Sequence, residues 1–192
     1  SAFDWNLILL KYGKLQEDAF KEPGGDKLKK WIDDCPNQLY SALIFEGGEV
    51  FKKRILDDIG DQSEVSKLIN KRSDSDFLEL MSNLGGHCIS TLCESFNKIK
   101  DDKPTAFIAY TIKGWGTPLA GHKDNHAGLM TKAQMDEFKS KLEINNGEEW
   151  DRFSDEKSQL NIDEYIKKLP FQKVGHRKFR GNKIVTDEPV LI

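Results

Sequence analysis

The sequence lacks a long apolar segment. No window of its 192 residues approaches the roughly 20 apolar residues that are needed to cross a bilayer. We therefore expect no membrane span. The residues from Ser1 to Trp5 include neither the basic nor the apolar region of a secretory signal, which predicts a cytoplasmic protein.

Cysteine and histidine are also scarce. Cys35, Cys88 and Cys93 form an odd set without a C-x-x-C pair, and the chain has only four histidines. This inventory supplies no recognisable zinc constellation, so no metal site is predicted from it. We expect the three thiols to be reduced and partly buried.

A uniformly basic surface is missing as well. The 29 Lys and Arg residues are balanced by 32 Asp and Glu residues, which gives a net charge of −3. Bulk binding to nucleic acid depends on an excess of positive charge, so we do not expect it here.

The composition that is present, 38% hydrophobic and 32% charged residues, is typical of one compact domain with an extension. Asn6 to Tyr12 reads as a strand buried on both faces of a parallel sheet, because it is a short aliphatic run that ends at Gly13. The region from Lys14 to about Leu84 is charge-rich and broken by turn signals, which predicts several short helices.

A second helix and strand pair follows Gly85-Gly86-His87. The apolar positions of this helix have helical spacing and predict one buried face (Ile89, Leu92, Cys93, Phe96 and Ile99). Thr105 to Ile112 is then the strongest strand signal in the chain. Helix, tight loop and buried strand together predict an α/β crossover and hence an α/β fold with a parallel sheet.

A loop of about 18 residues, Lys113 to Met130, comes after that strand and precedes a helix that Thr131 and Gln134 cap and that runs to about Leu142. We place a domain at 1–142 and an extended tail at 143–192, with a short helix near Asp163 to Lys168. The tail contains a run of basic residues that we interpret as a solvated segment, with a phosphate- or RNA-contacting arm as the alternative (Lys167, Lys168, Lys173, Arg177, Lys178, Arg180 and Lys183).

The loop after the second strand contains the candidate ligand-binding residues of the sequence. Ligands of open α/β sheets sit at the carboxyl edge, from which this loop emerges. Its two lysines and two histidines can supply positive charge and hydrogen bonds to a phosphate or carboxylate, and its glycines permit close backbone approach (Lys113, Gly114, Gly116, Gly121, His122, Lys123 and His126). An inert polar surface loop fits the same residues equally well.

Several motifs add a family resemblance to this reasoning. Thr111 to Gly116, T-I-K-G-W-G, resembles the T-I-K-G-[YW]-G motif of the homodimeric, thiamine-diphosphate-dependent first component of the pyruvate dehydrogenase complex. Ala120 to His126 is similar to the A-G-x-x-D-x-H loop of transketolases. Gly85-Gly86-His87 resembles the G-G-H-D of the dehydrogenase, with Cys88 in place of its Asp, and the strand from Trp5 resembles the family's W-N-V-I strand.

The resemblance implies roles for individual residues. Lys113 would lie beside the substrate end of the cofactor and pair with a 2-oxoacid carboxylate, and His126 would contact substrate or diphosphate from a mobile loop. Gly114, Gly116, His122, Asp124 and Asn125 would form the rest of the substrate- and cofactor-proximal loop. We expect residues from about Trp115 to Met130 to be the most mobile internal segment.

One pair of family elements is missing. Enzymes of this type hold the diphosphate through Mg²⁺ with a G-D-G motif and a later Asn, and neither occurs here. The glutamate that activates the thiazolium ring is absent too. The resemblance therefore implies the C-terminal half of a thiamine-diphosphate-binding domain, inactive by itself, with no cofactor or metal bound to this fragment.

The implied parent protein would use thiamine diphosphate and Mg²⁺. Its partners would be the remainder of the parent chain, a second subunit of a homodimer and the acyltransferase component of a 2-oxoacid dehydrogenase complex. Two alternatives stay open: a transketolase that acts on sugar phosphates, and a non-catalytic assembly or binding module.

Overall fold

The computed structural model describes residues 4–60, 63–150 and 156–169 of the chain. The chain divides between residues 138 and 139 into two units, and this boundary falls within helix α8. The elements in chain order are β1 (Asn6–Leu10), α1 (Lys14–Ala19), α2 (Gly25–Asp34), α3 (Asn37–Glu46), α4 (Gly48–Ile59), α5 (Ser63–Asn70), α6 (Asp74–Ser82), α7 (Ile89–Phe96), β2 (Thr105–Ala109), α8 (Lys132–Lys141) and α9 (Glu156–Lys168).

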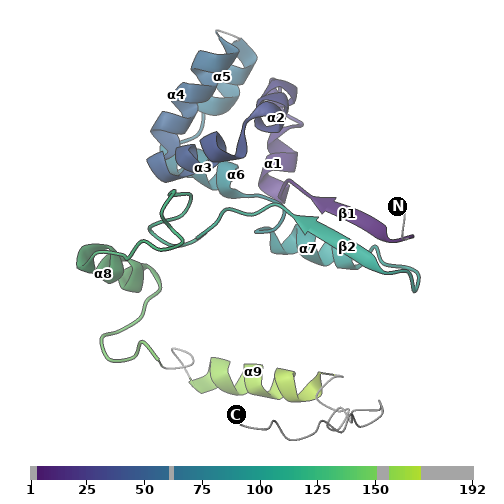
Figure 1. Ribbon diagram of the computed structural model, residues 1–192, viewed down its shortest axis with the longest axis vertical. Coiled ribbons are helices and arrows are strands. Elements are labelled where there is room, and N and C mark those ends of the chain that lie inside the picture. Colours follow the sequence, from purple (N-terminus) through teal and green to yellow (C-terminus); the bar gives the residue numbers. More distant parts are fainter. Residues whose placement is uncertain (1–3, 61–62, 151–155, 170–192) are drawn as a thin grey trace, which may run out of the picture. The chain divides into compact units, whose positions relative to one another are not determined.

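The predicted α/β class is confirmed. β1 and β2 pair in parallel, with Asn6 opposite Thr105 and Leu10 opposite Ala109. Figure 1 shows α7 running alongside the two strands, while helices α1 to α6 gather beyond the ends of the strands. Everything from α1 to α7 therefore lies within one long crossover between two neighbouring parallel strands.

The core of the first unit lies mainly among the helices. Phe51 of α4 is fully buried, and its ring makes edge-on contacts with Tyr40 of α3 and Phe77 of α6 at centroid distances of 5.3 and 6.1 Å. The rest of this core comes mainly from α2 to α6 (Leu28, Ile32, Leu43, Ile44, Ile55, Val65, Leu68, Ile69, Leu80 and Met81).

The strand β1 does not have two buried faces, which corrects the sequence prediction. Leu10 is buried, but the side chains of Leu7 and Leu9 are 60% and 62% exposed. The sheet has two strands among the described residues, and the exposure of Leu7 and Leu9 shows that one face of β1 is largely uncovered there.

Helix α7 shows the same difference from its prediction. Its buried residues are Thr91 and Ser95, whereas Ile89 is 71% and Phe96 57% exposed. The spacing of the apolar positions is indeed that of a helix, but the face that packs against the protein is the small polar one. Cys88 is the N-cap residue of α7, and its side chain makes no capping hydrogen bond.

Two details of the second half match the sequence. The predicted cap of α8 is confirmed, because the Thr131 backbone N–H donates to Gln134 Oε1 at 2.9 Å and the Gln134 N–H donates to Thr131 Oγ1 at 3.2 Å. Helix α9 begins earlier than the predicted Asp163 and includes Lys167 and Lys168, while the remaining residues of the basic run lie outside the described residues.

No helix in the described parts of the chain is both long and apolar enough for a membrane span.

Candidate functional site

The carboxyl ends of both strands meet at the turn formed by residues 84–88. The Gly85 backbone N–H donates to the Lys11 carbonyl at 3.0 Å, just after β1, and the Gly86 N–H donates to the Tyr110 carbonyl at 2.9 Å, just after β2. The chain then continues from Tyr110 into the loop that begins at Lys113. The loop therefore leaves the carboxyl edge of the sheet, where the sequence placed it.

A cavity of about 510 Å³ lies between α3 and this loop, and we call it the α3 cavity. This volume is within the range of about 300–1,000 Å³ that is typical of small-molecule sites. Helix α3 contributes six of the lining residues and the loop contributes five (Asn37, Gln38, Ser41, Ala42, Phe45 and Glu46; Lys113, Gly121, His122, Lys123 and Asn125).

A second cavity of about 340 Å³, the strand-end cavity, lies where β1 and β2 end. It is lined by residues that follow the strands and by α2 and α3 (Lys11, Ile32, Asp33, Cys35, Asn37, Tyr40, Ser41, Leu84, Tyr110, Thr111, Ile112 and Lys113). Asn37, Ser41 and Lys113 line both cavities. Lys113 thus stands at the wall between them.

The loop is folded back on the start of its own sequence. The Lys113 carbonyl accepts hydrogen bonds from the Gly121 N–H at 3.1 Å and from Asn125 Nδ2 at 2.8 Å. The hydroxyl of Thr117 donates to the Gly114 carbonyl at 2.7 Å. The backbone of Lys113 is therefore held by donors from eight and twelve residues further along the chain.

Gly121 fixes this loop against α3. Its φ of +76° belongs to the left-handed region, and a Cβ there would lie 2.3 Å from the Ser41 carbonyl oxygen. Both facts exclude a larger residue, because a side chain at this position would be strained and would push the loop off the helix. The close approach of Gly121 to Ser41 forms the floor of the α3 cavity.

His122 packs its ring against Phe45 of α3 at a centroid distance of 4.5 Å. Its Nδ1 accepts the backbone N–H of Asp124 at 3.1 Å. The imidazole Nε2 and the aromatic face together give the α3 cavity one apolar wall with a polar edge.

The structure brings together some of the predicted site residues and not others. Lys113, His122 and Asn125 line the α3 cavity. Gly114, Gly116 and Asp124 belong to the same loop without lining either cavity, and His126 lies outside both. Sequence reasoning missed the α3 wall, because no sequence signal connects Asn37, Ser41 or Phe45 to a loop some 80 residues away.

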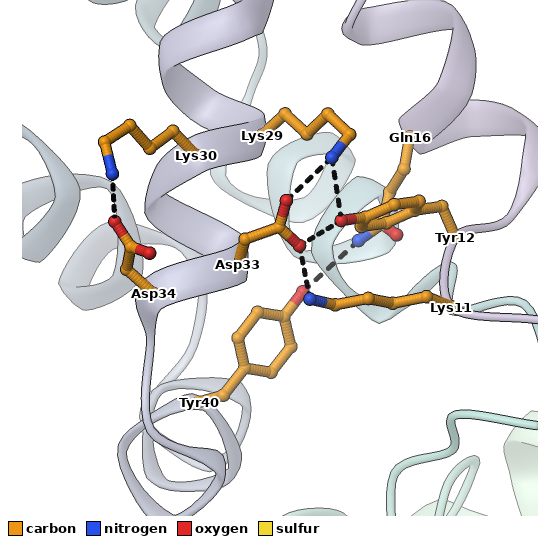
Figure 2. A network of polar contacts seen from close by, with 8 residues as sticks. All are labelled: Lys11, Tyr12, Gln16, Lys29, Lys30, Asp33, Asp34 and Tyr40. Atoms are coloured by element: carbon orange, nitrogen blue, oxygen red, sulfur yellow. Dashed lines mark hydrogen bonds and ion pairs between the residues drawn. The ribbon is translucent and has the colours of Figure 1, made fainter. Parts of the chain in front are cut away.

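Sequence reasoning also missed a polar network beside the strand-end cavity. Figure 2 shows the carboxylate of Asp33 accepting hydrogen bonds from Lys11, Lys29 and Tyr12, with Lys29 Nζ at 2.7 Å. Burial opposes ionisation of Asp33, but these donors outweigh it and hold the pKa of the carboxyl far below its usual range. The ion pair ties α2 to the segment that follows β1.

Tyr40 completes the wall of the strand-end cavity. Its hydroxyl donates to the Met81 carbonyl at 2.7 Å and lies 3.2 Å from Gln16 Nε2. Burial raises the pKa of Tyr40 well above its usual value, so the phenol is neutral at physiological pH. The charges that line this cavity are therefore the ammonium groups of Lys11 and Lys113 and the carboxylate of Asp33, an excess of one positive charge.

Thiamine diphosphate with Mg²⁺ does not fit the side chains in view. Among residues 4–60, 63–150 and 156–169, no cluster of three or more His, Cys, Asp or Glu side chains has the arrangement of a metal site. Mg²⁺ prefers hard oxygen ligands, such as carboxylates together with the phosphate oxygens themselves. The described residues can meet an organic anion, and they include no cluster of this kind beside the two cavities.

Comparison with known proteins adds a relationship to this geometry. The chain is 25% identical over 134 residues to the pyruvate dehydrogenase E1 component of Escherichia coli K12 and 25% identical over 133 residues to that of Buchnera aphidicola from Schizaphis graminum. The chain resembles a segment of E1 components. The E1 component of Cupriavidus necator is 22% identical over 179 residues, or 92% of the chain.

These matches cover 69% and 68% of the chain for the E. coli and Buchnera proteins. The chain spans about 14% of the length of those two relatives and 19% of the C. necator protein. No protein-family model matches the chain. The similarity supports correspondence to one part of a much larger E1-like protein.

Proposed function

We propose that this chain forms part of a thiamine-diphosphate-dependent 2-oxoacid dehydrogenase of the pyruvate dehydrogenase E1 type, to which it contributes the lysine that meets the substrate carboxylate. The observation that carries the proposal is the place of Lys113. It follows β2 within the T-I-K-G-W-G motif, and it lines both cavities at the carboxyl edge of the sheet.

The ammonium group of Lys113 is available for such a contact. Across the described residues, no carboxylate forms an ion pair with Lys113, whereas Lys11 nearby is already paired with Asp33. A charge-assisted hydrogen bond from an otherwise unpaired ammonium contributes roughly 1.5–3 kcal/mol to the binding of an anion. The side chain can therefore orient a carboxylate at the wall between the two cavities.

The rest of the α3 cavity suits a small keto acid. Asn37, Gln38 and Ser41 offer amide and hydroxyl groups on one side, and His122 with Phe45 offers a flat wall on the other. The names of the relatives favour pyruvate over a sugar phosphate as the substrate class. The expected roles of His126, Asp124, Gly114 and Gly116 in closing the loop over substrate remain part of the proposal.

Cofactor chemistry is assigned to other parts of the larger protein. Thiamine diphosphate supplies the carbanion that attacks the keto carbon in enzymes of this type, and its Mg²⁺ needs ligands that the described residues do not provide. The proposed partners are accordingly the remainder of a longer chain, a second subunit and the acyltransferase component. The chain by itself is then expected to be inactive.

The proposal is tested by titrating the isotope-labelled chain with pyruvate and following the amide resonances by NMR. We expect saturable shifts at Lys113, Gly121 and Asn125. Lys113→Ala should weaken the binding of pyruvate by about ten- to a hundredfold, as the loss of one charge-assisted bond predicts. Lys27→Ala is the matched control, because Lys27 is an exposed lysine of α2 that lines neither cavity, and it should bind pyruvate within about twofold of the wild type.

The outcomes separate the alternatives. Equal losses in the two variants, or no saturable shift in the wild type, would reject the role of Lys113. Tighter binding of fructose 6-phosphate than of pyruvate at the same residues would favour a transferase that acts on sugar phosphates.

A further inference from the structure

His87 contacts residues on both sides of Lys113. Its Nε2 accepts the backbone N–H of Ile112 at 2.7 Å, and its ring stacks on Trp115 at a centroid distance of 4.5 Å and an angle of 12° between the planes. Ile112 directly precedes Lys113, and Trp115 follows it by two residues. One imidazole therefore holds the chain before and after the lysine.

The segment that His87 holds is a tight turn. The Trp115 backbone N–H donates to the Ile112 carbonyl at 3.1 Å, which closes a four-residue turn with Lys113 and Gly114 at its centre. Gly114 has a φ of +73°, as the third residue of a type II turn requires. The imidazole thus contacts the first and last residues of the turn that presents Lys113.

His87 itself is well anchored. Its backbone N–H donates to the Leu84 carbonyl at 2.9 Å, and the preceding Gly86 is bonded to the Tyr110 carbonyl. The turn at residues 84–88 is consequently fixed to the ends of both strands. Because this turn is fixed to both strands, His87 can hold the backbone of Lys113 in a constant position at the wall between the two cavities.

We propose that His87 is the positioning residue for Lys113, and that it holds the turn from Ile112 to Trp115 only while its Nε2 is unprotonated. The contacts of His87 do not depend on the proposed function. The effect of these contacts on substrate binding does rest on the function proposed above.

The chemistry of the imidazole makes this hold depend on pH. A nitrogen that accepts the Ile112 N–H cannot carry a proton, so the ring proton is on Nδ1, and an imidazolium would offer two donors and no acceptor. Burial lowers the pKa of His87 below its ordinary value, which keeps the ring neutral at pH 7.

Several titratable groups lie on the segments that are bonded to the His87 turn. The titratable side chains on the segments bonded to this turn are Cys88 on the turn itself, Lys11, Tyr12 and Lys14 after β1, and Tyr110 and Lys113 after β2. None of these is a carboxylate, and no ion pair of His87 occurs in the part of the chain that the structure describes. Protonation of Nε2 therefore removes the Ile112 bond, and no ion pair among the described residues replaces it.

The sign of the pH effect follows from the lowered pKa. The unfolded or released His87 takes up its proton near pH 6.5, before the held imidazole does. The hold is thus complete above about pH 6.5 and is lost progressively as the pH falls below that value. The turn should loosen in acid while the helical core remains intact.

The test measures hydrogen-exchange protection of the Ile112 amide in the 192-residue chain between pH 5 and pH 8, corrected for intrinsic exchange. In the wild type, protection should fall about tenfold as the pH drops below about 6.5, which is the loss of one hydrogen bond. The amides of Phe51 and Phe77 in the core serve as the internal control and should keep their protection.

The matched variant is His87→Phe, which keeps a flat ring beside Trp115 and removes the acceptor. It should show the low protection of Ile112 at every pH, and it should weaken pyruvate binding at pH 7.5. If the variant does not fold, the pH dependence of the wild type decides the question alone.

The two proposals fail in different ways. Protection of Ile112 that does not change with pH in the wild type, or that survives His87→Phe, would overturn the positioning role of His87. A pH-dependent Ile112 in a chain that binds no pyruvate would leave the positioning of the turn standing and reject the substrate role of Lys113.

Discussion

Two regions of this protein differ in how far their apolar side chains are buried. In the helical region, α1 to α6, the apolar faces meet one another and Phe51, Ile55 and Phe77 are fully buried. In the strand region, β1, β2 and α7, Leu7, Leu9 and Ile89 remain mostly exposed. The contrast shows that an amphipathic pattern specifies an apolar face but not what covers it, and the uncovered face fits a segment of a longer E1-like protein.

The largest test of this contrast compares two phenylalanines. Phe51→Ala should lower the free energy of unfolding by about 3–5 kcal/mol, because it empties a packed site among Tyr40, Trp31 and Phe77. Phe96→Ala on α7 should cost less than about 1 kcal/mol, since that ring contacts Phe107 but remains mostly exposed. Urea unfolding of both variants, followed by circular dichroism, measures the difference.

Equal costs would break the comparison. They would mean that the exposed face of α7 is covered in solution. If self-association covers it, sedimentation of the wild type should show more than one copy of the chain.

A smaller effect is expected where the two regions join. Asp33 of α2 binds Lys11 and Tyr12, which directly follow β1 (Figure 2). Asp33→Asn should cost about 1 kcal/mol at pH 7, because Lys11 and Lys29 lose their common carboxylate. Asp34→Asn is the matched control, since Asp34 pairs with Lys30 on an exposed helix face, and it should cost less than about 0.5 kcal/mol.

The pH dependence of this difference follows from the lowered pKa of Asp33. A depressed carboxyl pKa stabilises the folded chain above the unfolded value of about 3.9, and that stabilisation is lost as the pH falls through and below it. The gap between wild type and Asp33→Asn should therefore be constant near neutrality and shrink below about pH 4. A gap that widened in acid would contradict the assignment.

The smallest effect is expected at one exposed side chain of β1, that of Leu9. Leu9→Ala should change the stability by less than about 0.5 kcal/mol, whereas its neighbour Leu10→Ala should cost about 2–5 kcal/mol. The two side chains point to opposite sides of one strand, and only that of Leu10 is buried. Thermal unfolding of the pair checks this, and similar melting temperatures would show that Leu9 is also covered.

The elements that sequence patterns could predict are those set by local chemistry. Gly85-Gly86 and Gly13 mark turns, Thr131 with Gln134 caps α8, and the aliphatic runs become the paired strands. Burial could not be predicted in the same way, because it depends on which surfaces meet. The apolar positions of α7 have the same spacing as those of a buried helix, yet Thr91 and Ser95 face the protein.

The same distinction applies to the candidate site, where local motifs could be predicted from the sequence and tertiary neighbours could not. The T-I-K-G-W-G motif placed Lys113 at the carboxyl edge, which depends only on the order of strand and loop. Its neighbours Asn37 and Ser41 come from α3 and reach it through the tertiary fold. The contact between His87 and Trp115 likewise joins two recognised motifs, and the two residues are 28 positions apart. Neither motif alone predicts this contact.

Two glycines of the loop have very different freedom to vary. Gly116 has a φ of +84°, and a Cβ at this position would have no heavy atom within 4 Å, so Asn or Asp, which tolerate this conformation, should be accepted there. Gly121 is pressed against the Ser41 carbonyl and should accept nothing else. In a saturation mutagenesis library, position 121 would therefore accept only Gly, whereas position 116 would accept Gly, Asn and Asp, although both belong to the same loop.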